Sequence, residues 1–152
     1  MPARYPDLQG RTVVITGASR GIGAQTARAF AEQGASVAVL GLDAEALAAV
    51  AAEAGGLAIR ADVTQYADLE AARERVEGEF GPADVLCAFA GGQGMPVPTW
   101  ELTPERWREV VDTDLTSAFL TIRAFLPGMI ERGRGAIVTM ASSSGRQPSK
   151  AN

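Results

Sequence analysis

The stretch Thr12-Val13-Val14-Ile15-Thr16-Gly17-Ala18-Ser19-Arg20-Gly21-Ile22-Gly23 decides how this chain folds. It begins as a β-branched run, typical of a strand, breaks at spaced glycines, and continues as an amphipathic helix. A helix N-terminus presents unpaired N–H groups and partial positive charge, and glycine lets an anion approach the backbone closely. The stretch therefore predicts a strand, a tight turn and a helix that together bind an anionic group such as a phosphate.

The composition excludes several classes of protein. The 152 residues carry a net charge of −4 and are 47% hydrophobic, which is ordinary for a globular domain and argues against nonspecific nucleic-acid binding. Histidine is absent, so the commonest metal ligand and general base are missing, and no metal site is expected. A single cysteine, Cys87, excludes an internal disulfide and suits a reducing compartment. With neither a signal-like nor a membrane-length apolar run, we expect a cytoplasmic protein without membrane contact.

Short apolar runs alternate with longer helical patterns along the whole chain. The runs predict strands at residues 11–16, 36–40, 57–61, 83–90 and 135–141. Because strands that alternate with helices form parallel sheets with right-handed crossovers, we expect an α/β fold with strand order 3-2-1-4-5.

Capping signals predict where the helices begin. The helix after the glycine turn places Ile22, Thr26 and Phe30 on one stripe and ends near Gly34. The later helices are expected to be capped at their N-termini by Asp43, by Thr64 and by Thr103, the last of these followed by Pro104. The helix capped by Thr64 should run to Phe80, and the one capped by Thr103 to near Glu131.

Polar and glycine clusters fall at the carboxyl ends of these strands. They are Gly17 to Gly23, Asp62, Gly91 to Gly94, and Ser142 to Gly145. Ligands of open parallel sheets bind outside the strand carboxyl ends, where the strand order reverses. The clusters therefore predict a functional cleft at this edge of the sheet.

Four segments together resemble the short-chain dehydrogenase/reductase superfamily, particularly its 3-oxoacyl-carrier-protein reductase-like branch. They are Thr16-Gly17-x-x-x-Gly21-Ile22-Gly23, Asp62-Val63, Ala90-Gly91, and the strand Ile137-Val138-Thr139-Met140-Ala141 that leads to Ser142. The resemblance covers essentially the whole chain in order and spacing. It implies a Rossmann-like three-layer αβα sandwich, with residues 1–152 forming one dinucleotide-binding domain that is truncated before its last two strands.

The resemblance implies hydride transfer between NAD(P)(H) and a small carbonyl or alcohol substrate. The glycines have the alternative of a turn that binds nothing, and Asp62 that of a plain turn former. The residues expected at the cofactor are Gly17, Ser19, Arg20, Gly21, Ile22, Gly23, Asp62, Val63, Ala90 and Gly91.

The end of the second strand bears on the choice between NAD and NADP. An acid there would bind the ribose 2′-OH of NAD, and an arginine would accommodate the 2′-phosphate of NADP. Gly41 and Leu42 occupy these places, so neither charge is present, and Asp43 is expected to cap a helix. Arg20 is the basic residue seen in NADP-preferring members of the family, so we expect NADP in preference to NAD.

Catalysis in the family uses a serine, a tyrosine, a lysine and an asparagine. Ser142 matches the serine, which polarises the substrate carbonyl, whereas Asp114 stands at the place of the asparagine that holds a relay water. Asp114 has the alternative of a solvent-facing helix residue. The family's two asparagines before Ala90 are replaced here by Ala88-Phe89, and Phe89 either reshapes the pocket or belongs to the core.

No Tyr-x-x-x-Lys segment follows Ser142 before Asn152, and Lys150 is interpreted as a loop residue. Three hypotheses therefore stay open: an oxidoreductase, a catalytically incomplete dinucleotide-binding module or sensor, and a structural protein that keeps only the fold. The resemblance also implies a homodimer or homotetramer. The sequence does not identify the substrate.

Overall fold

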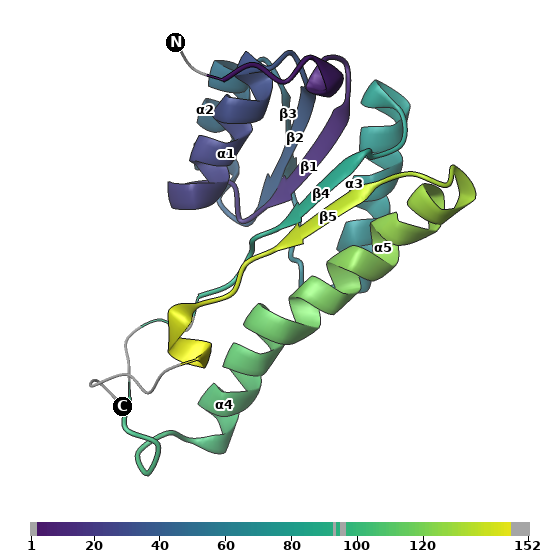
Figure 1. Cartoon of the computed structure of the whole chain (residues 1–152). Helices are drawn as coiled ribbons and strands as arrows, with labels where there is room; N and C mark the ends of the chain where they lie inside the picture. The colour runs from purple at the N-terminus through teal and green to yellow at the C-terminus, as the bar shows by residue number, and fades with distance from the viewer. Residues whose placement is uncertain (1–2, 93, 95–96, 147–152) are drawn as a thin grey trace.

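The computed structural model describes residues 3–92, 94 and 97–146, and these form one parallel five-stranded sheet (Figure 1). Lys150 lies outside this range. The strands follow the order β3-β2-β1-β4-β5, and every neighbouring pair is parallel, so the predicted topology is confirmed. Their bounds are β1 Thr12–Thr16, β2 Ser36–Gly41, β3 Leu57–Arg60, β4 Val85–Ala88 and β5 Ala136–Thr139.

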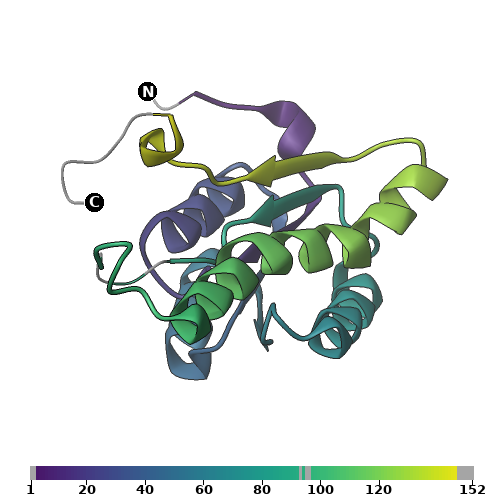
Figure 2. The same ribbon diagram turned by 90° about the horizontal axis from the view of Figure 1, so that it is seen from below.

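Helices cover both faces of this sheet, which gives the expected three layers (Figures 1 and 2). Helices α1 (Gly21–Glu32) and α2 (Ala44–Ala54) lie on one face. Helices α3 (Tyr66–Phe80) and α5 (Ser117–Glu131) lie on the other, and α4 (Pro104–Val111) extends beyond the carboxyl ends of the strands (Figure 1). No helix in these described residues is long and apolar enough to cross a membrane.

Strand β1 is the centre of the core and is buried along its whole length. Because side chains alternate along a strand, Val13 and Ile15 join the apolar cluster under α1 and α2, whereas Val14 joins the cluster under α3 and α5. A strand buried on both faces needs a continuous apolar run, and Val13-Val14-Ile15 supplies it.

The expected helix signals are confirmed in three places and wrong in one. Asp43 Oδ1 accepts the Ala46 N–H at 3.0 Å, and Thr103 Oγ1 accepts the Arg106 N–H at 3.2 Å. Gly34 follows α1 with a φ of +81°. Thr64, however, does not cap α3: Gln65 occupies the N-cap position, and the Thr64 N–H and hydroxyl both donate to Asp62. The helix begins two residues later without a side-chain cap.

The buried face of α1 also differs from the expected stripe. Gly23, Ala24 and Ala27 are the buried residues, whereas Ile22 is 63% exposed and Phe30 is only partly buried. Because these side chains are small, the helix can lie close to the sheet. This close packing determines which face of α1 is buried, although the larger apolar side chains lie on another face.

The long helix expected after Thr103 is present but not regular. A π-helical segment, Asp112–Thr116, joins α4 to α5, and the three run on without a break (Figure 2). Pro104 occupies the first turn, as predicted. Neither the hydrophobic spacing nor the capping residues predict the π-helical segment.

Asp84 ties three strands together at the edge opposite the predicted cleft. Its Oδ2 accepts the Thr12 N–H at 3.2 Å, and its backbone carbonyl accepts the Ala136 N–H at 2.9 Å. Its buried Oδ1 makes no hydrogen bond but lies 3.6 Å from Arg11 Nη1 and 3.5 Å from Arg134 Nε. The guanidinium groups of Arg11 and Arg134 therefore compensate the negative charge of this carboxylate, which lies directly before β4.

We expect Asp84→Ala to lower the free energy of unfolding by about 2 kcal/mol, because it leaves the buried Thr12 N–H without its acceptor. Urea unfolding measures the change. The matched control is Glu53→Ala, which removes a surface ion pair to Arg28 and should cost under about 1 kcal/mol. Equal losses in the two variants would contradict the role of Asp84.

Cys87 lies in β4, and burial raises the pKa of its thiol from the ordinary value of 9.0 to about 11. Because the thiolate is the reactive form, iodoacetamide at pH 8 should label the folded protein far more slowly than the urea-unfolded protein. Mass spectrometry gives both rates. Equally fast labelling of the folded protein would show that β4 opens readily.

Candidate functional site

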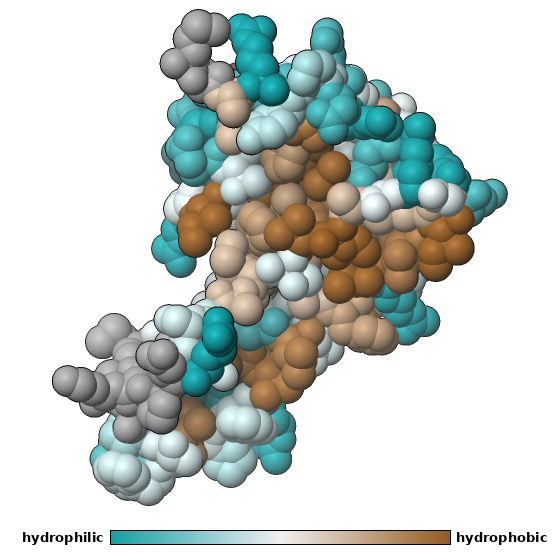
Figure 3. Space-filling view, in the orientation of Figure 1, coloured by the Kyte–Doolittle hydropathy of each residue, from teal (hydrophilic) through white to brown (hydrophobic). Residues whose placement is uncertain are grey.

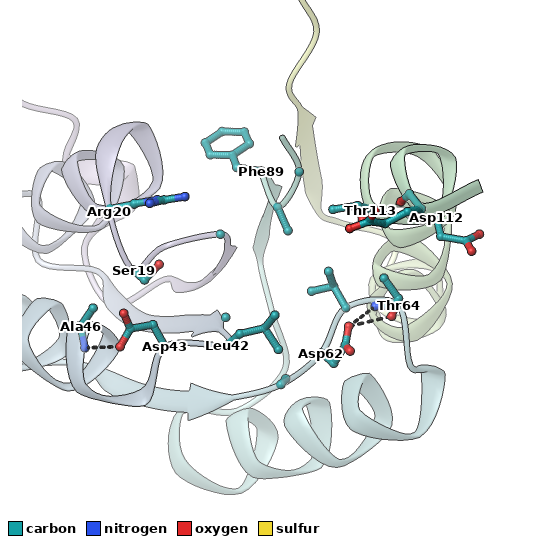
Figure 4. Close-up of a pocket in the computed structure, with 17 residues that line it drawn as sticks. Ser19, Arg20, Leu42, Asp43, Ala46, Asp62, Thr64, Phe89, Asp112 and Thr113 are labelled. Carbon is teal, nitrogen blue, oxygen red and sulfur yellow. Dashed lines mark hydrogen bonds between the residues drawn. The ribbon is translucent and has the colours of Figure 1, made fainter. Parts of the chain in front are cut away.

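A cavity of about 710 Å³ lies at the carboxyl ends of the strands, where the sequence predicted a cleft (Figure 4). Its size suits a cofactor or a small-molecule ligand. The cavity brings together seven of the residues expected at a cofactor: Gly17, Ser19, Arg20, Asp62, Val63, Ala90 and Gly91. Gly21, Ile22 and Gly23 begin α1 and do not line this cavity.

The glycines of the turn after β1 are needed for different reasons. Gly17 has a φ of +65°, and a Cβ there would lie 2.8 Å from the Ala90 Cα. A Cβ on Gly23 would overlap the Gly17 carbonyl oxygen. The turn is therefore packed tightly against both α1 and the loop after β4, and Ser19 and Arg20, directly before α1, line the cavity.

Ser19 and Arg20 enter the cavity from the N-terminus of α1 (Figure 4). Arg20 occupies the N-cap position but makes no side-chain cap, and no acidic residue lies in the first turn. The partial positive charge of the helix is therefore not neutralised locally, and an anion can use it.

Asp62 closes the opposite side of the cavity. Its Oδ1 accepts the Thr64 N–H at 2.9 Å and the Thr64 hydroxyl at 2.7 Å, and its own N–H donates to Asp68 Oδ2 at 2.9 Å. The carboxylate forms a turn and lines the cavity at once. Forming a turn therefore does not prevent Asp62 from facing a ligand in the cavity.

Thr16 organises the loop after β4 and was not anticipated as a site residue. Its Oγ1 accepts the N–H groups of Phe89 and Ala90, each at 3.1 Å. These bonds turn the chain away from β4, which is why that strand ends at Ala88 rather than at Ala90. The sequence signal that could have predicted this role is a hydroxyl residue directly before the glycine turn.

Phe89 lies between the cavity and the core. It lines the cavity (Figure 4) and packs partly buried against the apolar cluster under α1 and α2. An aromatic ring thus stands where the resemblance led us to expect an amide.

The two predicted catalytic residues do not line the cavity. Ser142 follows β5 and is exposed. Asp114 lies in the π-helical segment, where its Oδ1 accepts the Gly92 N–H at 2.7 Å, so it faces the loop after β4 rather than solvent alone. Three further residues line the cavity from this long helix without any prior signal: Glu109, Asp112 and Thr113.

Charge in the cavity is unevenly distributed. Among the described residues that line it, Arg20 is the one cationic side chain. Asp43 is held as the cap of α2, and Asp112 accepts the Thr116 hydroxyl at 3.2 Å. No group of histidine, cysteine and acidic residues in the described part of the chain is arranged to hold a metal ion. Carboxylates thus outnumber cations in the lining, and the positive charge that an anion could use is confined to the side of Ser19 and Arg20.

Comparison with known proteins agrees with this geometry. The chain is 39% identical over 143 residues to a D-beta-hydroxybutyrate dehydrogenase of Cupriavidus necator, and the match covers 91% of this chain and 55% of the relative. It is 38% identical to a D-threitol dehydrogenase of Mycolicibacterium smegmatis, with 90% and 54% covered. The chain thus spans little more than half the length of these relatives.

Solved structures share the fold. A 3-ketoacyl-(acyl-carrier-protein) reductase of Brucella melitensis complexed with NADH superposes with a TM-score of 0.89 at 31% identity, covering 93% of this chain and 61% of that one. A metagenomic short-chain oxidoreductase in complex with NADP gives 0.88 at 33% identity, covering 95% and 68%. The sequence model described as short chain dehydrogenase matches residues 11–152. The chain therefore belongs to the short-chain dehydrogenase/reductase family.

Proposed function

We propose that this cavity binds a nicotinamide dinucleotide, and that the protein transfers hydride between it and a carbonyl or alcohol substrate. The observation that carries the proposal is the cavity itself, which joins an uncompensated helix N-terminus on one side to Asp62 and Val63 on the other. An anion site on one side and the pair Asp62 and Val63 on the other suit a dinucleotide, whose pyrophosphate lies between its two nucleoside ends.

Each predicted residue has a role in this proposal. The N-terminus of α1, with Ser19, would hold the pyrophosphate, and Arg20 would contact the ribose or its 2′-phosphate, while Gly21 and Gly23 shape the turn and Ile22 borders it. Asp62 and Val63 would contact the adenine. Ala90 and Gly91 would border the nicotinamide half, and the crowding at Gly17 fixes their position.

The proposed chemistry acts on a carbon–oxygen bond. The bound cofactor supplies or accepts the hydride. Ser142, which follows β5, would donate a hydrogen bond to the substrate oxygen and polarise it. Neither tyrosine of the chain, Tyr5 or Tyr66, lines the cavity, so no general acid is assigned within this chain. The names of the two dehydrogenase relatives support a hydroxyl-bearing substrate class.

Arg20 supports a preference for NADP over NAD. It is the sole cation in the part of the cavity lining that the structure describes, whereas Leu42, directly after β2, is 59% exposed and offers no charge. A guanidinium group pairs well with a phosphate, so a 2′-phosphate within its reach would gain affinity.

A dinucleotide-binding module without catalysis is the second candidate. Two observations favour it: Ser142 and Asp114 do not line the cavity, and Phe89 replaces the family's asparagine. Cofactor binding is common to both candidates, and turnover separates them.

We also propose a cytoplasmic homo-oligomer. Apolar residues are exposed on the long helix and on β5, among them Trp107, Leu115, Phe119, Ile137 and Val138. Figure 3 shows apolar side chains gathered over β5 and the adjoining part of α5. Surfaces of this kind favour association between protein chains.

Titration with NADPH and NADH, followed by their fluorescence, tests the proposal. We expect both to bind and NADPH to bind more tightly. Arg20→Ala should weaken NADPH roughly 10- to 100-fold, because a charge-assisted hydrogen bond is lost, and should weaken NADH less. Arg28→Ala is the control, since Arg28 lies on the same helix but pairs with Glu53. Binding of neither dinucleotide refutes the proposal, and tighter NADH refutes the preference.

Gly23→Ala should lower the free energy of unfolding by about 2 kcal/mol and weaken NADPH binding, because its Cβ displaces the Gly17 carbonyl. Gly78→Ala is the control: Gly78 lies in α3 with open space around it, so alanine should add about 0.5–1 kcal/mol without changing NADPH affinity. Urea unfolding and NADPH titration measure both variants. Unchanged NADPH affinity in Gly23→Ala would separate the turn from cofactor binding.

A further inference from the structure

The loop after β4 adopts a backbone that only glycine adopts readily. Gly91 has a φ of +153° and Gly92 a φ of +143°. A Cβ on Gly92 would meet nothing within 4 Å, so it is the backbone conformation, not crowding, that calls for glycine there. Glycine also makes the loop flexible, so contacts with the rest of the fold must hold this conformation.

Two side chains hold the loop, one from each side. Thr16 Oγ1 accepts the N–H groups of its first two residues, Phe89 and Ala90, at the end of β1. Asp114 Oδ1 accepts the Gly92 N–H at 2.7 Å, the distance of a charge-assisted bond. The same oxygen would lie 3.1 Å from a Cβ on Gly91. Asp114 therefore lies against the backbone of a residue that lines the cavity.

The π-helical segment sets the position of Asp114. A π-helical segment accommodates one more residue per turn than a regular helix, and such segments are frequent at functional sites. Two side-chain bonds reinforce this segment: the Thr113 hydroxyl donates to the Glu109 carbonyl, and the buried Ser117 hydroxyl donates to the Thr113 carbonyl. The carboxylate is thus presented to the loop by a reinforced part of the helix.

We propose that Asp114 is a positioning residue that locks the Gly91–Gly92 loop in the shape of the cavity wall, and that it does not carry a proton. The lock is a property of the free protein. Its effect on the dinucleotide rests on the proposed function.

The chemistry of the side chain separates these two roles. A hydrogen-bond acceptor is all that the Gly92 N–H requires, and the amide oxygen of asparagine provides one. A proton carrier requires an ionisable group, which asparagine lacks. Asp114→Asn should therefore preserve the lock, and Asp114→Ala should abolish it.

Amide hydrogen exchange followed by NMR tests the lock directly in the free protein. Asp114→Ala should speed exchange of the Gly92 N–H by about tenfold, whereas Asp114→Asn should stay close to the original chain. Thr116→Ala is the matched control, because it removes a bond to Asp112 in the same π-helical segment and should leave Gly92 unchanged. NADPH and NADH titrations of the same variants should show weaker binding in Asp114→Ala alone.

A measurement on the unaltered chain keeps the proposal testable if Asp114→Ala does not fold. The bond predicts a scalar coupling between the Gly92 amide nitrogen and the Asp114 carboxylate carbon. Absence of this coupling, or Gly92 exchange unaffected by Asp114→Ala, overturns the lock. Faster exchange with unchanged dinucleotide affinity overturns its effect on binding, whereas failure of every chain to bind dinucleotide overturns the proposed function and leaves the exchange result standing.

Discussion

The hydrogen bonds of Thr16 are the constraint on which the cavity depends. This buried hydroxyl sits at the last residue of β1, directly before the glycine turn, and receives two N–H groups from the chain that leaves β4. The two central strands therefore diverge at a fixed point. The turn above β1 and the loop above β4 then form facing walls, and the crowding between Gly17 and Ala90 keeps them in contact.

The fold follows from the sequence because its signals are local and repeated. Val13-Val14-Ile15 marks a strand buried on both faces, and the capping residues Asp43 and Thr103 mark helix starts through bonds to residues three positions ahead. Parallel order then follows from the alternation of strands and helices. Seven of the ten expected cofactor residues line one cavity because parallel strands end at the same edge.

What the sequence did not show depends on contacts between distant segments. Thr64 has the residue type of a helix cap, but its N–H and hydroxyl donate to Asp62, and α3 begins at Tyr66 instead. The partner of Asp114 is a glycine N–H 22 residues earlier, which no spacing rule predicts. The small buried face of α1 reflects how closely that helix lies to the turn, a distance set by tertiary packing and not by hydrophobicity.

The π-helical segment also fixes the rotational phase of the long helix. Each residue of an α-helix turns the chain by about 100°. If Asp112–Thr116 were wound as a regular α-helix with no residue removed, all of α5 would rotate by about that angle relative to α4, because a π-helical turn holds one residue more. The residues Ser117, Thr121, Ala124 and Phe125, now buried against the sheet and α3, would then swing toward solvent. The wide turn therefore absorbs one residue, so removing one residue there and restoring a regular helix would leave the buried face of α5 in place.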